Sequence, residues 1–273
     1  MQDPDLQERI EAARLAVREA GAIAMRYFEE GVKTWHKTDD EPVSEADYAV
    51  DDHLKEKLVG RWETDGWLSE ESSRIGAEGA RKLTWVVDPI DGTRAFIKQK
   101  PHFTVCLGLV ENDRAVYGAV YNPALDEFFE AEAGEGALCN GRPIHVNSHD
   151  RLDGLKMIGY REMFAEKHWK SPWPKIEVAL VNSIAYRMVL VASGAHDAVV
   201  NLRPQNDWDI VAAELILREA GGKCTDRDGN PYRFHGQGGK NQSVIAANPV
   251  LQDKLVEKFR DFAPKIPKSQ QKS

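Results

Sequence analysis

The stretch Trp85-Val86-Val87-Asp88-Pro89-Ile90-Asp91-Gly92-Thr93 carries the strongest structural signal in the sequence. Its apolar start is typical of a buried strand, and the run stops abruptly at Asp88, so a carboxylate is expected at the strand end. The proline has no N–H to donate and fixes the turn, while Gly92 lets the backbone approach a ligand closely. Two carboxylates three residues apart can converge on one hard cation. If a helix starts at the second aspartate, the N–H groups around Gly92 and Thr93 also form an anion site. The alternative is a plain turn with an aspartate helix cap.

Three acidic groups elsewhere in the chain are candidates for the same site. Glu70 belongs to an acidic pair that follows a short apolar patch, and it is either a solvated surface residue or a ligand. Asp209 opens an expected helix, where it acts either as the N-cap or as a carboxylate aimed at a metal. Asp47 has the spacing of a capping box with Ser44, and a catalytic role requires that it also point toward Thr93.

The apolar periodicity of the chain predicts a mixture of helices and antiparallel strands. Three- and four-residue steps predict a long first helix over 6–28, and alternation predicts a hairpin and a further strand over 103–133. The other expected elements are a polar loop at 38–43, helices from 44 and over 183–193, 209–220 and 250–262, and strands at 85–87, 196–200 and 243–247. This order predicts an α+β or layered α/β fold in one compact unit. Its N-terminal half (1–150) would carry the main metal and phosphate motifs. Its C-terminal half (151–273) would carry Asp209 and the residues that select the substrate.

Composition narrows the class of partner. The 273 residues carry a formal net charge of −8, which disfavours nucleic acid polymers and anionic membranes as ligands. No apolar run approaches the ~20 residues needed to span a bilayer, and the N-terminus does not have the pattern of a signal peptide. The three cysteines are far apart, which argues against a disulfide framework or a thiolate zinc site and indicates a cytoplasmic protein. An acidic protein can still bind a small phosphate compound where metal ions invert the local field.

Taken together, these segments resemble the inositol monophosphatase superfamily of Mg²⁺-dependent, lithium-sensitive phosphatases. The resemblance runs through most of the chain, in the same order. It rests on Ser44-Glu45-Ala46-Asp47, Ser69-Glu70-Glu71-Ser72, the Asp88–Thr93 motif, Gly136-Ala137-Leu138-Cys139-Asn140-Gly141, and Trp208-Asp209 with Glu219-Ala220-Gly221-Gly222. The Asp88–Thr93 motif and the later Trp-Asp helix are highly specific as a pair. The resemblance implies a layered α-β-α-β-α fold, usually as a homodimer.

The resemblance also implies a role for each candidate residue. Two or three Mg²⁺ ions would be held by Glu70, Asp88, the Ile90 carbonyl, Asp91 and Asp209. The catalytic residues would be Asp47, Thr93 and Glu70, with Thr93 and Asp47 orienting or deprotonating the attacking water. The substrate would contact Gly92, Thr93 and Asp209. Because clustered carboxylates repel one another, we expect the metal-free site to be loose or partly protonated.

The segment ahead of Trp208 separates the members of this superfamily. Inositol-specific enzymes carry a glutamate there that binds sugar hydroxyls, whereas this chain has Asn201-Leu202-Arg203-Pro204-Gln205-Asn206-Asp207. The Pro204 segment looks more like the bacterial 3′(2′),5′-bisphosphate nucleotidase branch, which converts adenosine 3′,5′-bisphosphate to AMP. Arg203 is either a surface arginine or the contact for the second phosphate. Inositol 1-phosphate, histidinol phosphate and fructose 1,6-bisphosphate stay open as substrates. A metal-binding regulator with a phosphatase scaffold is the non-enzyme alternative.

Overall fold

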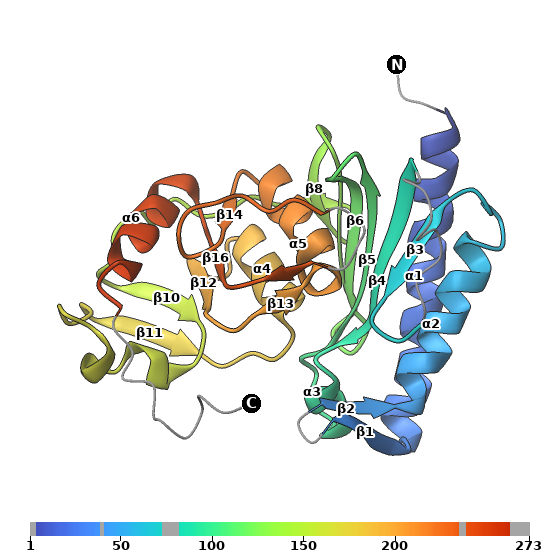
Figure 1. The fold of residues 1–273 in the computed structure, drawn as a ribbon, viewed down its shortest axis with the longest axis horizontal. Helices are drawn as coiled ribbons and strands as arrows, with labels where there is room; N and C mark the ends of the chain where they lie inside the picture. The colour runs from blue at the N-terminus through green and yellow to red at the C-terminus, as the bar shows by residue number, and fades with distance from the viewer. Residues whose placement is uncertain (1–3, 39–40, 73–81, 235–238, 263–273) are drawn as a thin grey trace.

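The computed structural model describes residues 4–38, 41–72, 82–234 and 239–262. These residues form five layers in the order helix, sheet, helix, sheet, helix, as Figure 1 shows from one side. This confirms the layered fold class predicted from the order of helices and strands, and the α-β-α-β-α architecture implied by the family resemblance. Within the described ranges, no helix is both long and apolar enough to cross a membrane.

A seven-stranded sheet is the larger of the two main sheets, and its strands follow one another in chain order. The first two strands are parallel, and every later pair is antiparallel. The strands are β3 Gly66–Ser69, β4 Leu83–Asp91, β5 Thr104–Glu111, β6 Arg114–Asn122, β7 Glu127–Glu132, β8 Gly136–Cys139 and β9 Arg142–Pro143. The hairpin and further strand expected over 103–133 are therefore confirmed as β5, β6 and β7.

Two helices cover one face of this sheet, α1 (Pro4–Glu30) and α2 (Glu45–Leu58). Alternation along β4 decides which side chains they bury: Trp85 and Val87 pack with the two helices, and Val86 packs on the opposite side. At ~25 cal/mol per Å² of apolar surface removed from water, such aromatic side chains contribute strongly to this layer.

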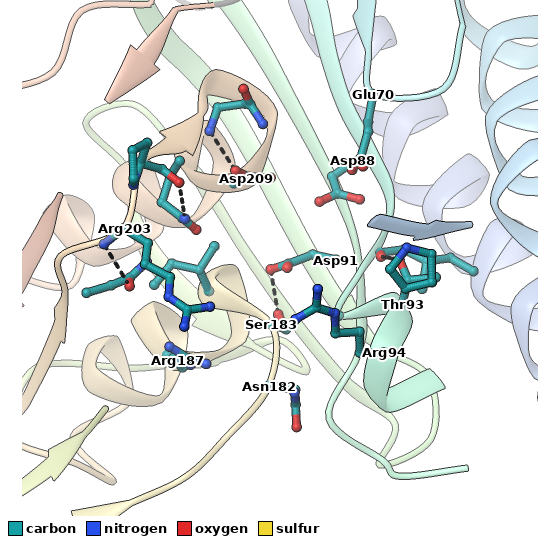
Figure 2. A pocket seen from close by; sticks show the side chains of 18 of the residues that line it. Glu70, Asp88, Asp91, Thr93, Arg94, Asn182, Ser183, Arg187, Arg203 and Asp209 are labelled. Atoms are coloured by element: carbon teal, nitrogen blue, oxygen red, sulfur yellow. Dashed lines mark hydrogen bonds between the residues drawn. The ribbon is translucent and has the colours of Figure 1, made fainter. Parts of the chain in front are cut away.

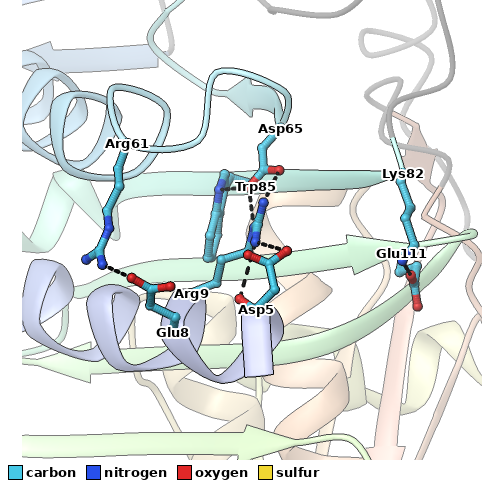
Figure 3. Close-up of polar contacts among 8 residues, drawn as sticks. All are labelled: Asp5, Glu8, Arg9, Arg61, Asp65, Lys82, Trp85 and Glu111. Carbon is cyan, nitrogen blue, oxygen red and sulfur yellow. Dashed lines mark hydrogen bonds and ion pairs between the residues drawn. The ribbon is translucent and has the colours of Figure 1, made fainter. Parts of the chain in front are cut away.

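A buried ion pair joins α1 to the sheet (Figure 3). The Arg9 guanidinium donates to both carboxylate oxygens of Asp65, at 2.8 and 3.0 Å, and the Trp85 indole N–H donates to the same carboxylate at 3.1 Å. Arg9 and Asp65 are 4% and 3% exposed. Arg9 also forms an ion pair with Asp5, whereas the Asp65 carboxylate has Arg9 and the indole as its partners. Removing Arg9 would therefore leave a buried carboxylate without its counter-charge.

The middle layer consists of α4 (Ile184–Ala192) and α5 (Asp207–Glu219), which lie between the two main sheets. Two glycines let α5 approach the larger sheet closely. A Cβ atom on Gly108 would lie 2.7 Å from Val211 Cγ1, and one on Gly118 would lie 2.7 Å from the Ala212 carbonyl oxygen. Larger residues at these glycines would push away the helix that carries Asp209.

The second main sheet has five strands in the order β11-β10-β12-β16-β14, and α6 (Pro249–Phe259) covers its outer face. Its strands are β10 Leu155–Ile158, β11 Ile176–Ala179, β12 Ala198–Asn201, β14 Lys223–Thr225 and β16 Val244–Ala247. The remaining elements are β1 Thr34–Thr38, β2 Glu41–Ser44, α3 Thr93–Ile97, β13 Gln205–Asn206, β15 Lys240–Asn241 and two short 3₁₀ helices, Arg161–Phe164 and Glu166–His168.

The segment expected as a polar loop at 38–43 is not a loop throughout. Thr38 ends β1, and β2 begins at Glu41, so most of the segment belongs to an antiparallel ladder in which Trp35 pairs with Val43. The prediction failed because the residues here are mostly polar and show no apolar alternation, although their backbones pair as an antiparallel hairpin. The hairpin leads directly into α2, and Pro42 lines the cleft described next.

Candidate active site

A cleft of about 330 Å³ lies where the ends of β3 and β4 meet the starts of α4 and α5. Figure 2 shows its polar side chains converging from these elements. Apart from Asp47, every residue that the sequence predicted for the site lines this cleft: Glu70, Asp88, Ile90, Asp91, Gly92, Thr93, Arg203 and Asp209. The cleft therefore joins motifs that lie more than a hundred residues apart in the chain.

The strand that delivers the first carboxylates is longer than expected. It does not stop at Asp88 but continues to Asp91, and the ladder with β5 shifts register between these two residues. Pro89 lies within this irregular stretch, where its missing N–H breaks the regular ladder. The helix that follows begins at Thr93 rather than at Asp91, with Gly92 before it at φ 98°. The anion site expected for a helix starting at Asp91 is therefore not formed in that way.

Three carboxylates form a cluster that can hold a cation. One oxygen from each of Glu70, Asp88 and Asp209 lies within 4.8 Å of the others. Glu70 reaches this point because β3 runs parallel to β4 and its amide continues the ladder, donating to the Val87 carbonyl oxygen at 3.3 Å. The short run Gly66–Ser69 gave no clear strand signal, so the parallel pairing that places Glu70 was missed.

Asp88 is the buried carboxylate that the other acidic side chains of the cleft surround. It is 2% exposed, and burial raises the pKa of its carboxyl well above the usual value, with further increases from the charges of Glu70, Asp91 and Asp209. No donor among the described residues reaches its Oδ1 atom. A buried carboxylate oxygen that faces other carboxylates needs either a proton or a cation. The all-oxygen donor set fits Mg²⁺.

Asp91 is held by the start of α4. Its Oδ2 atom accepts hydrogen bonds from the Ser183 hydroxyl at 2.6 Å and from the Ala185 N–H at 2.8 Å. Burial still raises the pKa of Asp91, although these hydrogen bonds and the charge of Arg187 oppose the rise. Ser183 was not predicted as a site residue. Its position at the start of the expected helix at 183–193 was the available signal, because serine is a common N-cap.

Asp209 is not the first residue of its helix. The helix begins at Asp207, with Asn206 as N-cap, and Asp209 is the third helical residue. Its Oδ2 atom accepts from the Asn206 N–H at 2.6 Å and completes a capping box. The N-cap interpretation was therefore wrong by three positions. The carboxylate still contributes to the cluster.

The two carboxylate oxygens of Asp47 have different partners: one caps helix α2 and the other faces Thr93. Oδ2 accepts from the Ser44 N–H at 2.8 Å and from the Ser44 hydroxyl at 2.6 Å, which confirms the expected capping box. Oδ1 lies 3.4 Å from the Thr93 hydroxyl. The same hydroxyl lies 3.0 Å from the Ile90 carbonyl oxygen. The geometric condition for a combined cap and catalytic role is thus met.

Arginines line the side of the cleft opposite Glu70 and Asp88 (Figure 2). Arg203 is there as predicted, and Arg94 and Arg187 were missed. Arg187 is only 5% exposed, and its Nε–H donates to the Val181 carbonyl oxygen at 2.5 Å. The guanidinium carbons of Arg187 and Arg203 lie 5.3 and 5.1 Å from the centre of the Tyr160 ring.

The phenol of Tyr160 responds to the positive charge in this part of the cleft. Burial raises its pKa, but the hydrogen bond and charge of Arg187, with the charges of Arg203 and Arg94, outweigh burial and leave the pKa below its usual value. A lowered phenol pKa indicates a positive local potential. The cleft is therefore acidic on one side and basic on the other.

Comparisons with known proteins agree with this fold. The model of the family described as "Inositol monophosphatase family" matches residues 5–263. A histidinol-phosphatase from Chlorobaculum parvum is 30% identical, over 93% of this chain and 95% of its own. An inositol monophosphatase from Dictyostelium discoideum is also 30% identical, over 93% and 96%. The solved structure of an IMPase from Thermotoga maritima aligns with a TM-score of 0.80 and 27% identity, covering 93% of this chain and 97% of its own.

Proposed function

The chain belongs to the inositol monophosphatase family and is a phosphatase of phosphate monoesters, and we propose that its substrate is a 3′,5′-bisphosphate nucleotide. The reaction would remove the 3′-phosphate from adenosine 3′,5′-bisphosphate and leave AMP. The acidic cluster supports the phosphatase chemistry, and the arginines support the choice of substrate.

The family is metal-dependent, and two or three Mg²⁺ ions are proposed as the cofactor. Glu70, Asp88 and Asp209 would hold them, together with Asp91 and the Ile90 carbonyl. When bound, the ions neutralise charge on the phosphate, lower the pKa of a water and stabilise the departing alkoxide. The Oδ1 atom of buried Asp88, which no donor in the described parts of the chain reaches, is the structural feature that most needs such a cation.

Thr93 and Asp47 are proposed to handle the proton of the attacking water. The Thr93 hydroxyl would accept a hydrogen bond from the water and pass its own proton toward Asp47 Oδ1. The 3.4 Å separation is long for a hydrogen bond, but such contacts commonly tighten when substrate binds. Asp47 Oδ2 is committed to Ser44, so rotation of the carboxylate is limited and Oδ1 stays aimed at Thr93.

The single observation that carries the substrate proposal is the pair of arginines without an acidic partner. Within the described residues, no carboxylate lies within 4 Å of the guanidinium nitrogens of Arg187 or Arg203, although Arg187 is almost fully buried. A nearly buried cation that forms no ion pair is costly, so a ligand anion at this place would be stabilising. A guanidinium binds phosphate oxygens in a bidentate manner.

The need for an anion beside Arg187 and Arg203 distinguishes between the competing substrates. Inositol 1-phosphate offers neutral hydroxyls beyond its phosphate, and histidinol phosphate offers an ammonium that two arginines would repel. A bisphosphate nucleotide presents a second phosphate to the arginines. It also presents a base that can stack on the 38% exposed ring of Tyr160. Fructose 1,6-bisphosphate shares the second phosphate but not the base.

The test is phosphate release from these substrates side by side, with Mg²⁺ and then with EDTA. We expect adenosine 3′,5′-bisphosphate to have the highest kcat/KM and EDTA to abolish release from every substrate. If inositol 1-phosphate or histidinol phosphate matched or exceeded the nucleotide, the substrate proposal would be wrong. Undiminished release in EDTA would contradict the metal assignment instead.

Three further properties implied by the family are proposed for this chain: a homodimer, a cytoplasmic location and inhibition by lithium. Light scattering of the purified protein tests the first, and cell fractionation tests the second. For the third, millimolar LiCl should reduce turnover at saturating Mg²⁺, since Li⁺ would compete for a carboxylate site. Unchanged turnover would set this chain apart from the sensitive members.

A further inference from the structure

The start of α4 contains a serine in an unusual backbone conformation next to the carboxylate cluster. Ser183 has φ 61° and ψ 117°, a region that residues with a side chain rarely adopt. Its backbone nitrogen lies 3.2 Å from where a Cβ atom on Gly92 would be, so the start of α4 packs tightly against the end of β4. Strain of this kind persists where surrounding contacts impose it.

Hydrogen bonds to the Ser183 hydroxyl account for its position. The hydroxyl donates to Asp91 Oδ2 at 2.6 Å and accepts from the Tyr186 N–H at 2.9 Å. The hydroxyl of Thr104 lies 3.0 Å away. Since Ser183 has one proton and gives it to the carboxylate, Thr104 must donate to Ser183. The three contacts use the full capacity of the serine hydroxyl.

The chain of hydrogen bonds extends one step further into the sheet. The Thr104 oxygen can accept from the Cys106 thiol, whose sulfur lies 3.3 Å away. Strand pairing fixes both residues opposite the carboxylates, because Thr104 pairs with Asp91 and Cys106 pairs with Asp88 across β4 and β5. All three side chains are buried. The negative charge of Asp91 therefore orients a chain that runs Cys106, Thr104, Ser183, Asp91.

We propose that Ser183 and Thr104 are positioning residues that hold the Asp91 carboxylate in its metal-binding orientation. With Oδ2 fixed by Ser183 and by the start of α4, the rotation of the carboxylate is restricted and its other oxygen is left for a metal ion. The proposal rests on the proposed role of Asp91 as a metal ligand. Under this proposal, the metal affinity depends on how α4, from the C-terminal half of the chain, packs against the seven-stranded sheet.

The test is to titrate the intact, metal-free protein with Mn²⁺ in the absence of substrate and to measure binding by electron paramagnetic resonance. Ser183→Gly removes the hydroxyl and suits the positive φ, and Thr104→Val removes the donor with little change of shape. Because outer ligands of metal sites typically contribute tenfold or more to affinity, we expect about a tenfold weaker site in Ser183→Gly and a smaller loss in Thr104→Val. Thr104→Ser should restore wild-type affinity.

A matched control separates positioning from simple loss of a helix cap. Asn248 caps α6 through a hydrogen bond from the Leu251 N–H at 3.0 Å. Asn248→Gly should lower the Tm without changing Mn²⁺ affinity. The proposal is overturned if Ser183→Gly and Thr104→Val both bind Mn²⁺ like wild type. If they do so while Asp91→Asn binds weakly, only the positioning role fails. If the wild-type protein binds no Mn²⁺, the metal assignment fails and the positioning role fails with it.

Discussion

Asp47 and Thr93 meet across two helix starts, with Asp47 Oδ1 lying 3.4 Å from the Thr93 hydroxyl while Asp47 Oδ2 caps its own helix. Because one oxygen of Asp47 is held by the start of the helix, the helix fixes the direction of the other oxygen. Asp209 is arranged similarly, since its Oδ2 atom accepts the backbone N–H of Asn206. Helix starts also carry a partial positive charge, which reduces the cost of gathering these acids in one place.

The first prediction concerns this pair. Thr93→Val and Asp47→Asn should each lower kcat by roughly 10²–10⁴ with little change in KM, because the side chains that they change act on the water, whereas the phosphate contacts expected of Gly92 and Thr93 are backbone N–H groups. Steady-state kinetics at saturating Mg²⁺ measures the effect. Thr93→Ser keeps the hydroxyl and should retain most activity. A wild-type kcat in Thr93→Val would remove Thr93 from the mechanism.

The second prediction is that Asp88→Asn stabilises the metal-free protein while abolishing activity. Burial and neighbouring carboxylates disfavour the charge on Asp88, so a neutral amide of the same shape should raise the Tm in EDTA. Activity should fall by orders of magnitude, because a cluster ligand is lost. Thermal unfolding in EDTA and phosphate release in Mg²⁺ provide the two measurements. Asp209→Asn should also abolish activity. A lower Tm in Asp88→Asn would contradict the electrostatic account.

The third prediction concerns how the Asp88 carboxyl makes the stability of the metal-free protein depend on pH. The pKa of Asp88 is raised in the folded state, so the native protein retains this proton at pH values where the unfolded chain has lost it. The associated stability is fully present below the unfolded pKa of about 3.9 and is lost as the pH rises through the folded pKa. In EDTA, the Tm of wild type relative to Asp88→Asn should therefore fall as the pH rises. Added Mg²⁺ should raise the wild-type Tm most at the alkaline end. A difference that does not vary with pH would argue against a raised pKa.

The layered fold was predictable because its largest elements have strong periodic patterns. The steps between Ile10, Val17 and Ala24 in α1, and the alternation through β5 and β6, survive in the structure almost unchanged. Weakly patterned elements were missed. The parallel strand β3 has four buried residues and no alternation, and β1 and β2 pair through their backbones although few of their residues are apolar.

The site was predictable where one short motif supplies the chemistry and not where tertiary packing supplies it. Asp88 and Asp91 lie within four residues of each other, and Asp209 follows a recognisable tryptophan. Ser183 and Arg187 enter the cleft only because α4 docks against β4, and no local pattern encodes that contact. The same argument explains why the helix starts were misplaced by two residues, since caps depend on backbone conformation that propensity does not resolve.

The fourth prediction tests the ion pair that joins α1 to the sheet. Arg9→Met should lower the free energy of unfolding by about 3–5 kcal/mol, because it leaves the buried Asp65 carboxylate without its counter-charge. Denaturant unfolding measures the loss. Arg61→Met is the matched control, since the ion pair between Arg61 and Glu8 is exposed and should contribute less than about 1 kcal/mol (Figure 3). Equal effects of the two variants would mean that burial of the Arg9 pair has no energetic consequence.

The fifth prediction tests the basic side of the cleft. Arg203→Gln should raise KM for adenosine 3′,5′-bisphosphate about tenfold or more, because a charge-assisted contact to the second phosphate is lost. Turnover of 3′-AMP, which lacks that phosphate, should change little. Arg260, the C-cap residue of α6, lies outside the cleft, so Arg260→Gln controls for the change of net charge. If Arg203→Gln weakened both nucleotides equally, the arginine would act on the reacting phosphate or on the base. The second phosphate would then have to be bound elsewhere in the cleft, with the buried Arg187 as the remaining group that has no acidic partner in the described chain.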